Sequence, residues 1–249
     1  MPDTMPDSRL LITGASSGVG RSLVGHLKGQ FEIIAVARRL DRMKRQFGGD
    51  DQVHCYRLDL ADTEALGDRL EEILGRHGPV LNLINNAGVN VSGRVEEISD
   101  EDVQQSFQVN AFAPLKLMQT VLPDMQSAGF GRIINVTSGA PLNCFPEYAA
   151  YSASKGALNA FTVTAAQEYE GDNIKINLMS PGPVQTEMAP DAPMEPSVCH
   201  PTADHLLGLG EEGPTGQFFW LGYKIPLFPD LSGVEWLEGN ASDQYEQVL

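Results

Sequence analysis

The chain has 249 residues, of which 42% are hydrophobic and 20% charged, a composition that predicts one large globular domain and excludes a disordered or collagen-like chain. Its 17 basic and 33 acidic residues give a formal net charge of −16, which argues against a protein that binds nucleic acid or an anionic membrane. No apolar run is long enough to span a bilayer, and we find no secretory signal at the N-terminus. We therefore expect a cytoplasmic protein.

Short apolar runs alternate with segments of helical periodicity along the chain. The apolar runs predict strands at 10–12, 33–36, 53–58, 80–84, 132–137, 175–179 and 217–221. Helices are predicted over 21–28, over 62–76, from about residue 100, over 151–170 and over 202–209. This alternation is typical of α/β proteins. It predicts a doubly wound Rossmann fold, with a single parallel sheet of about seven strands, helices on both faces, and a site at the carboxyl ends of the strands.

A glycine-rich turn, Thr13–Gly20, follows the first predicted strand and opens the first predicted helix. Its glycines, Gly14, Gly18 and Gly20, let the backbone approach a pyrophosphate closely, and the helix N-terminus offers free N–H groups to it. A tight turn that binds no ligand is the alternative. Three glycines at this spacing, directly after a strand, favour a dinucleotide site.

Two arginines, Arg38 and Arg39, end the second predicted strand. In dinucleotide-binding folds an acidic residue at about this place binds the ribose 2′-hydroxyl of NAD. A guanidinium binds a 2′-phosphate in a bidentate manner, whereas a carboxylate would repel it. The sequence therefore predicts NADP(H) as the cofactor, with a solvated basic patch as the alternative.

Tyr151 and Lys155 lie four residues apart on a predicted helix and therefore share one face of it. A phenol with a pKa of about 10 is a poor acid or base at neutral pH, but a nearby ammonium lowers that pKa. We therefore expect Tyr151 to exchange a proton with a substrate oxygen, and Lys155 to tune its pKa.

These motifs resemble those of the classical short-chain dehydrogenase/reductase family, whose glycine pattern is TGxxxGxG, over about residues 10–188. The resemblance implies that Ser138 orients the substrate carbonyl, that Lys155 also holds the nicotinamide ribose, and that Asn110 positions a water beside it. Together with Tyr151 these residues form a catalytic tetrad. The resemblance further implies cofactor contacts from Gly14, Ser16, Ser17, Gly18, Val19, Gly20, Arg38, Arg39, Asp59, Leu60, Asn86, Ala87, Gly88, Tyr151, Lys155, Pro181, Gly182, Val184 and Thr186.

The chain is expected to form one domain, with a family-like core at 8–188, a short substrate lid at 189–216, a last-strand region at 217–229 and an acidic tail at 230–249. A fairly apolar substrate pocket is predicted from Ser138, Leu142, Cys144, Phe145, Tyr148 and Met188. The resemblance also implies a homodimer or homotetramer. Apolar side chains in the tail favour its docking near the pocket, and a functionless tail is the alternative.

The predicted function is NADPH-dependent reduction of a small ketone or aldehyde to an alcohol, or the reverse reaction. Two alternatives stay open: a redox sensor that binds NADP without turnover, and a dehydratase or epimerase on the same fold. The five histidines show no metal-ligand spacing, the three cysteines are widely spaced, and no Gly-x-Ser-x-Gly motif occurs. We therefore expect neither a metal site nor a hydrolase nucleophile.

Overall fold

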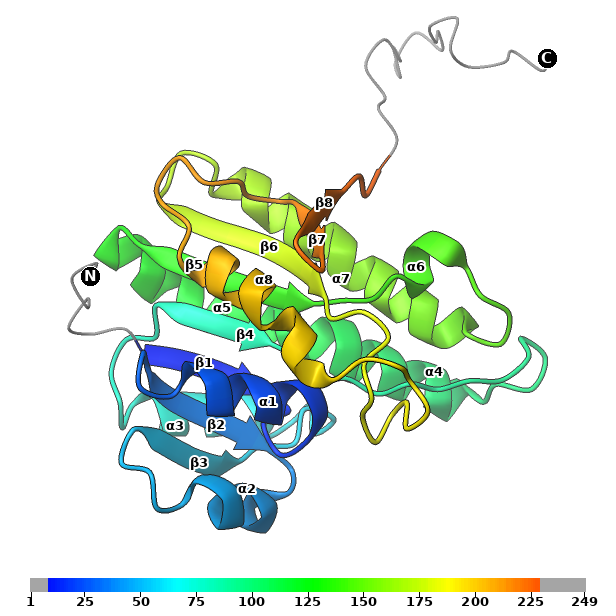
Figure 1. The fold of residues 1–249 in the computed structure, drawn as a ribbon, viewed down its shortest axis with the longest axis horizontal. Helices are drawn as coiled ribbons and strands as arrows, with labels where there is room; N and C mark the ends of the chain where they lie inside the picture. Colours follow the sequence, from blue (N-terminus) through cyan, green and yellow to red (C-terminus); the bar gives the residue numbers. More distant parts are fainter. Residues whose placement is uncertain (1–8, 229–249) are drawn as a thin grey trace, which may run out of the picture.

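The computed structural model describes residues 9–228, and the tail at 230–249, predicted to dock near the pocket, lies outside the described residues. Figure 1 shows one sheet with helices on both of its faces. Its strand order is β3-β2-β1-β4-β5-β6-β7-β8. The strands are β1 (Arg9–Thr13), β2 (Glu32–Ala37), β3 (Val53–Arg57), β4 (Asn82–Asn85), β5 (Gly131–Val136), β6 (Ile174–Ser180), β7 (Phe218–Trp220) and β8 (Tyr223–Ile225).

Two apolar clusters, one on each face of the sheet, form the core. Helices α1 (Gly18–Leu27), α2 (Leu40–Phe47) and α8 (His200–Leu207) contribute to one cluster. Helices α3 (Leu66–Leu74), α5 (Ala113–Ala128) and α7 (Ala149–Glu168) contribute to the other, together with a π-helical turn, η1 (Gln108–Phe112), that joins α4 (Asp100–Phe107) to α5. The predicted doubly wound α/β fold is confirmed.

Strand β1 shows why the strands of this sheet appear in the sequence as continuous apolar runs. Leu10 and Ile12 belong to the cluster beneath α1, whereas Leu11, between them, belongs to the cluster on the other face. Successive side chains of a strand point to opposite faces, so a strand covered on both sides is apolar at every position.

Helix α2 and strand β8 are among the elements that we did not predict. Helix α2 is short and strongly charged: Met43 and Phe47 are buried and Leu40 is partly buried, so only three apolar residues mark its inner face. Strand β8 pairs antiparallel with β7 at the edge of the sheet, which therefore has eight strands, not seven parallel ones. Tyr223 and Lys224 are exposed, so no apolar run marks this strand.

The segment predicted as a substrate lid contains a 3-10 turn, η2 (Pro196–Cys199), followed by α8. Ala203, Leu206 and Leu207 of α8 belong to the same apolar cluster as α1, so this helix covers the sheet. Among residues 9–228, no helix is long and apolar enough to cross a lipid bilayer.

Candidate active site

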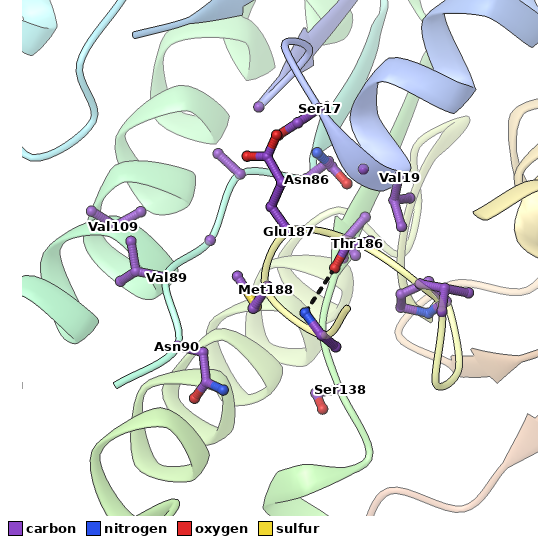
Figure 2. A pocket seen from close by; sticks show the side chains of 18 of the residues that line it. Ser17, Val19, Asn86, Val89, Asn90, Val109, Ser138, Thr186, Glu187 and Met188 are labelled. Carbon is purple, nitrogen blue, oxygen red and sulfur yellow. Dashed lines mark hydrogen bonds between the residues drawn. The ribbon is translucent and has the colours of Figure 1, made fainter. Parts of the chain in front are cut away.

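A cleft of about 490 Å³ opens at the carboxyl ends of the parallel strands, where the fold class placed a site. Figure 2 shows it with Ser17 and Asn86 toward one end and Asn90 and Ser138 toward the other. The predicted site residues that line it are Gly14, Ser16, Ser17, Gly18, Val19, Arg38, Arg39, Asp59, Leu60, Asn86, Ala87, Gly88, Ser138, Phe145, Tyr148, Tyr151, Lys155, Pro181, Gly182, Val184, Thr186 and Met188.

The glycine turn is packed against the segment that follows β4. Gly14 has a positive φ of 70°, and a Cβ on it would lie 2.8 Å from Asn86 Nδ2, too close for any other residue. A Cβ on Gly20 would lie 2.5 Å from the Gly14 carbonyl oxygen. Asn86 Nδ2 in turn donates a hydrogen bond to the Thr13 carbonyl at 2.9 Å. Gly20 is therefore required by packing, and it does not line the cleft.

At one end of the cleft, the carboxylate of Glu187 lies between the side chains of Arg39 and Arg42. Arg39 donates hydrogen bonds to Ser16 Oγ at 3.2 Å, to Ser17 Oγ at 2.6 Å and to the Glu187 carboxylate at 2.7 Å. Arg42 donates to the other oxygen of the same carboxylate. The hydrogen bonds from Arg39 and Arg42 hold the pKa of Glu187 below its usual value. This end of the cleft is therefore built to bind negative charge.

The remaining residues of this end are less constrained. Arg38 is exposed and lines the cleft next to Arg39. Asp59 also lines it, and its Oδ1 accepts a hydrogen bond from the Ala61 N–H at 3.1 Å, which fixes the turn after β3. Of Arg38 and Arg39, only Arg39 has side-chain hydrogen bonds among residues 9–228.

The other end of the cleft contains a buried lysine. Lys155 is only 3% exposed, and its Nζ donates a hydrogen bond to the Val136 carbonyl at 2.8 Å. Burial lowers the pKa of Lys155 to about 8. A Cβ on Gly88 would lie 3.2 Å from Asn110 Oδ1 and 3.5 Å from this Nζ, so Gly88 packs directly against both side chains.

Tyr151 lies one helical turn before Lys155 and lines the same end of the cleft. Burial raises the pKa of Tyr151, and a hydrogen bond with Ser138 acts in the opposite direction. The sequence argument expected Lys155 to lower this pKa, and for the structure described here that expectation is wrong. Burial outweighs the favourable contact, so the phenol stays protonated at neutral pH.

Asn110 lies in the π-helical turn η1 and does not line the cleft. Its Oδ1 accepts from the Val89 N–H at 2.9 Å, and its Nδ2 donates to the Val89 carbonyl at 2.9 Å and to Ser154 Oγ at 3.0 Å. Asn110 therefore fixes the backbone after β4 against α7, and its role in positioning a water stays a prediction.

Two residues predicted to contact the substrate lie elsewhere. Leu142 and Cys144 belong to the short turn of α6 (Ala140–Asn143) and its end, where both are exposed and neither lines the cleft. Conversely, the sequence analysis missed Asn90 and Glu187, which do line it. Asn90 follows the recognisable Asn-Asn-Ala-Gly stretch by two residues, and that proximity was the one signal available for it.

A polar cluster lies at the opposite edge of the sheet, where the strands begin. Glu32, His54 and His77 bring potential ligand atoms within 4.8 Å of one another. The Glu32 carboxylate accepts from His54 Nε2 at 3.0 Å and from Arg9 Nε at 3.0 Å. Because the Arg9 guanidinium already neutralises the carboxylate, we interpret the cluster as an ion-pair network. The expectation of no metal site stays a prediction.

Comparisons with known proteins agree with the fold. The sequence pattern of the short chain dehydrogenase family matches residues 8–196. An L-xylulose reductase of Mus musculus is 37% identical over 185 residues, which cover 72% of this chain and 73% of that protein. A dehydrogenase/reductase SDR family protein 7-like of Anopheles gambiae is 33% identical over 194 residues. These cover 74% of this chain but only 61% of that longer protein.

Among solved structures with the same fold, one is in complex with NADH and another with NADP. A 4-hydroxyisoleucine dehydrogenase complexed with NADH superposes with a TM-score of 0.80 at 26% identity, covering 86% of this chain and 96% of that one. A metagenomic short-chain oxidoreductase in complex with NADP has a TM-score of 0.76 at 25% identity, covering 88% and 98%. The choice between the two cofactors must therefore be argued from this chain's own residues.

Proposed function

The chain belongs to the short chain dehydrogenase family, and from this premise we propose that it reduces a ketone or aldehyde to an alcohol with NADPH, or catalyses the reverse reaction. One observation carries the proposal. Ser138, Tyr151 and Lys155 line the same cleft as the glycine turn, so a proton donor and a dinucleotide would meet there.

The cleft fits a dinucleotide in two respects. A Cβ on Gly18 would lie 3.0 Å from the Thr186 methyl group, so the turn and the segment after β6 approach closely, and a side chain at Gly18 would narrow the passage. The guanidinium of Arg39 binds a carboxylate here, and the same donors suit the 2′-phosphate that distinguishes NADP from NAD. Bound NADPH would supply a hydride to the carbonyl carbon of the substrate.

The chain's own residues would manage the proton. Tyr151 donates its phenolic proton to the carbonyl oxygen as that oxygen gains negative charge, and its raised pKa keeps the proton available for this step. Ser138 hydrogen-bonds the same oxygen and the phenol. Lys155 lies one turn further along the same helix, where its ammonium would hold the nicotinamide ribose of the bound cofactor.

The test is an assay of NADPH oxidation with a panel of ketones and aldehydes, run with wild type and Tyr151→Phe. We expect oxidation of NADPH by wild type only. A redox sensor would bind NADPH and oxidise none of it. A dehydratase or epimerase would convert a substrate while the NADPH concentration stayed constant. The oligomeric state and the cellular location stay predictions.

A further inference from the structure

One polar side chain at the catalytic end of the cleft has no hydrogen-bond partner for its oxygen among residues 9–228. The sequence predicted a fairly apolar pocket, and Phe145, Tyr148 and Met188 do line the cleft. Asn90 lines it as well, and its Oδ1 is buried without a hydrogen-bond partner among the described residues. An amide left unpartnered in a protein interior costs free energy, so its presence here calls for a partner that binds in the cleft.

The backbone on both sides of Asn90 is fixed by the catalytic region. On one side, Asn110 binds both the N–H and the carbonyl of Val89, each at 2.9 Å. On the other side, the Gly93 N–H donates to the Glu147 carbonyl at 2.8 Å, next to Tyr148. The backbone that carries Asn90 is therefore fixed before any substrate binds, which limits the positions that its side chain can take in the cleft.

We propose that Asn90 determines specificity by hydrogen-bonding a hydroxyl group close to the reacting carbonyl, and that the substrates are hydroxy ketones or hydroxy aldehydes. The proposal rests on the proposed function, since the carbonyl is the group that Ser138 and Tyr151 bind. Figure 2 shows Asn90 and Ser138 at the same end of the cleft, with Met188 above them. A hydroxyl both donates and accepts, so it satisfies either the oxygen or the nitrogen of the amide.

The experiment compares two ketones that differ by one group. In 1-hydroxy-2-butanone a hydroxyl takes the place of a methyl group of 3-pentanone. We would measure kcat/KM for both ketones with wild type and with Asn90→Leu, which keeps the size of the side chain and removes its polar atoms. The ratio of kcat/KM for 1-hydroxy-2-butanone to kcat/KM for 3-pentanone should be at least about tenfold lower in Asn90→Leu than in wild type. Comparing the ratios cancels the greater intrinsic reactivity of the hydroxy ketone.

Gln126→Leu is the control, because Gln126 is an exposed amide residue on α5 that does not line the cleft. Its ratio should equal that of wild type. An unchanged ratio in Asn90→Leu overturns the proposal. Thermal unfolding separates a structural role: an unpartnered amide replaced by leucine should leave stability unchanged or raised. A clear loss of stability with an unchanged ratio would make Asn90 a structural residue.

Two further measurements keep the result decisive. If Asn90→Leu does not fold, Asn90→Ala should show the same fall in the ratio. If wild type oxidises no NADPH with either ketone or with the wider panel, the proposed function has failed. The affinity of the NADPH complex for each ketone, measured by NMR titration, then tests the role of Asn90 independently of turnover. Equal preference for the hydroxy ketone in wild type and Asn90→Leu would overturn the proposal.

Discussion

The charged side chains at the two ends of the cleft differ in their exposure to solvent. At the end that contains the glycine turn, the side chains of Arg39 and Glu187 are 48% and 51% exposed. At the end that contains Tyr151, Lys155 is 3% exposed. Charges at the first end are screened by water and salt, whereas a charge at the second end lies in a medium of low polarizability.

This difference predicts how each end responds to substitution. Removing an exposed charge changes a binding constant modestly and in a salt-dependent way. Removing a buried titratable group changes catalysis, stability and pH dependence together. The substitutions below are ordered by the size of the expected effect, from the buried end to the exposed one.

Tyr151→Phe should have the largest effect. It removes the proton donor while keeping the ring that packs at an angle to Tyr148, with centroids 6.2 Å apart. We expect kcat to fall by about 10²–10⁴-fold or more, with NADPH affinity nearly unchanged. Steady-state kinetics and a fluorescence titration of NADPH measure the two quantities. Substantial turnover by the variant would mean that another residue is the acid.

Lys155→Met should abolish most turnover and yet stabilise the folded protein. Burial lowers the pKa of Lys155 from 10.5 to about 8, so below pH 8 the fold carries a buried charge at a cost. Replacing it by an apolar side chain of similar length should raise the free energy of unfolding at pH 7 by about 1–3 kcal/mol. Urea unfolding measures this gain.

The pH dependence of that gain gives a sharper test. Between about pH 8 and 10.5 the unfolded chain binds more protons at Lys155 than the folded chain does, so wild type gains stability as the pH rises through this window. The advantage of Lys155→Met should therefore be greatest below pH 8 and shrink toward pH 10.5. Lys116→Met, at an exposed lysine on α5, should show no such advantage. A gain independent of pH would contradict the interpretation.

For the end of the cleft that contains Tyr151 and Lys155, the sequence predicted that these side chains lie together but not the direction of the Tyr151 pKa shift. Tyr151 and Lys155 share a helix face, so their proximity follows from spacing alone. Their pKa values depend on burial, to which β5 and the loop after β4 contribute from other parts of the sequence. For this reason the direction of the Tyr151 shift could not be derived from the four-residue spacing.

The residues that sequence analysis missed share a physical reason. Asn90 and Glu187 lie in loops, where no periodicity marks which side chains point inward. Glu187 meets Arg39 although 148 residues separate them, because the segment after β6 crosses toward the turn at the end of β2. Local motifs predict the strand ends at which such loops begin. They do not predict how two loops pack against each other.

At the exposed end, Arg39→Ala should weaken NADPH binding about ten- to a hundredfold, since it removes a charge-assisted hydrogen bond of about 1.5–3 kcal/mol to the 2′-phosphate. NADH binding should change little. Arg45→Ala, at an exposed arginine of α2 that does not line the cleft, is the matched control. Titrations of both cofactors at two salt concentrations provide the measurement. Equal affinity of wild type for NADPH and NADH would contradict the NADP assignment.

Glu187→Gln should have the smallest effect and the opposite sign. The Glu187 carboxylate shares Arg39 with any 2′-phosphate that binds there, so the two anions compete for one guanidinium. Exposed ion pairs contribute up to about 1 kcal/mol, so removing this charge should tighten NADPH binding by about two- to fivefold. NADH carries no 2′-phosphate, and its affinity should not rise.

The gain from Glu187→Gln should fade as salt is added, because salt screens the exposed carboxylate in wild type. It should also vanish in the double variant with Arg39→Ala, since no guanidinium is then left to compete for. If NADPH binding instead weakens in Glu187→Gln, the carboxylate orients Arg39 and Arg42 for the phosphate. The exposed end would then depend on preorganisation, as the buried end does, and the contrast between the two ends would be smaller than their exposure indicates.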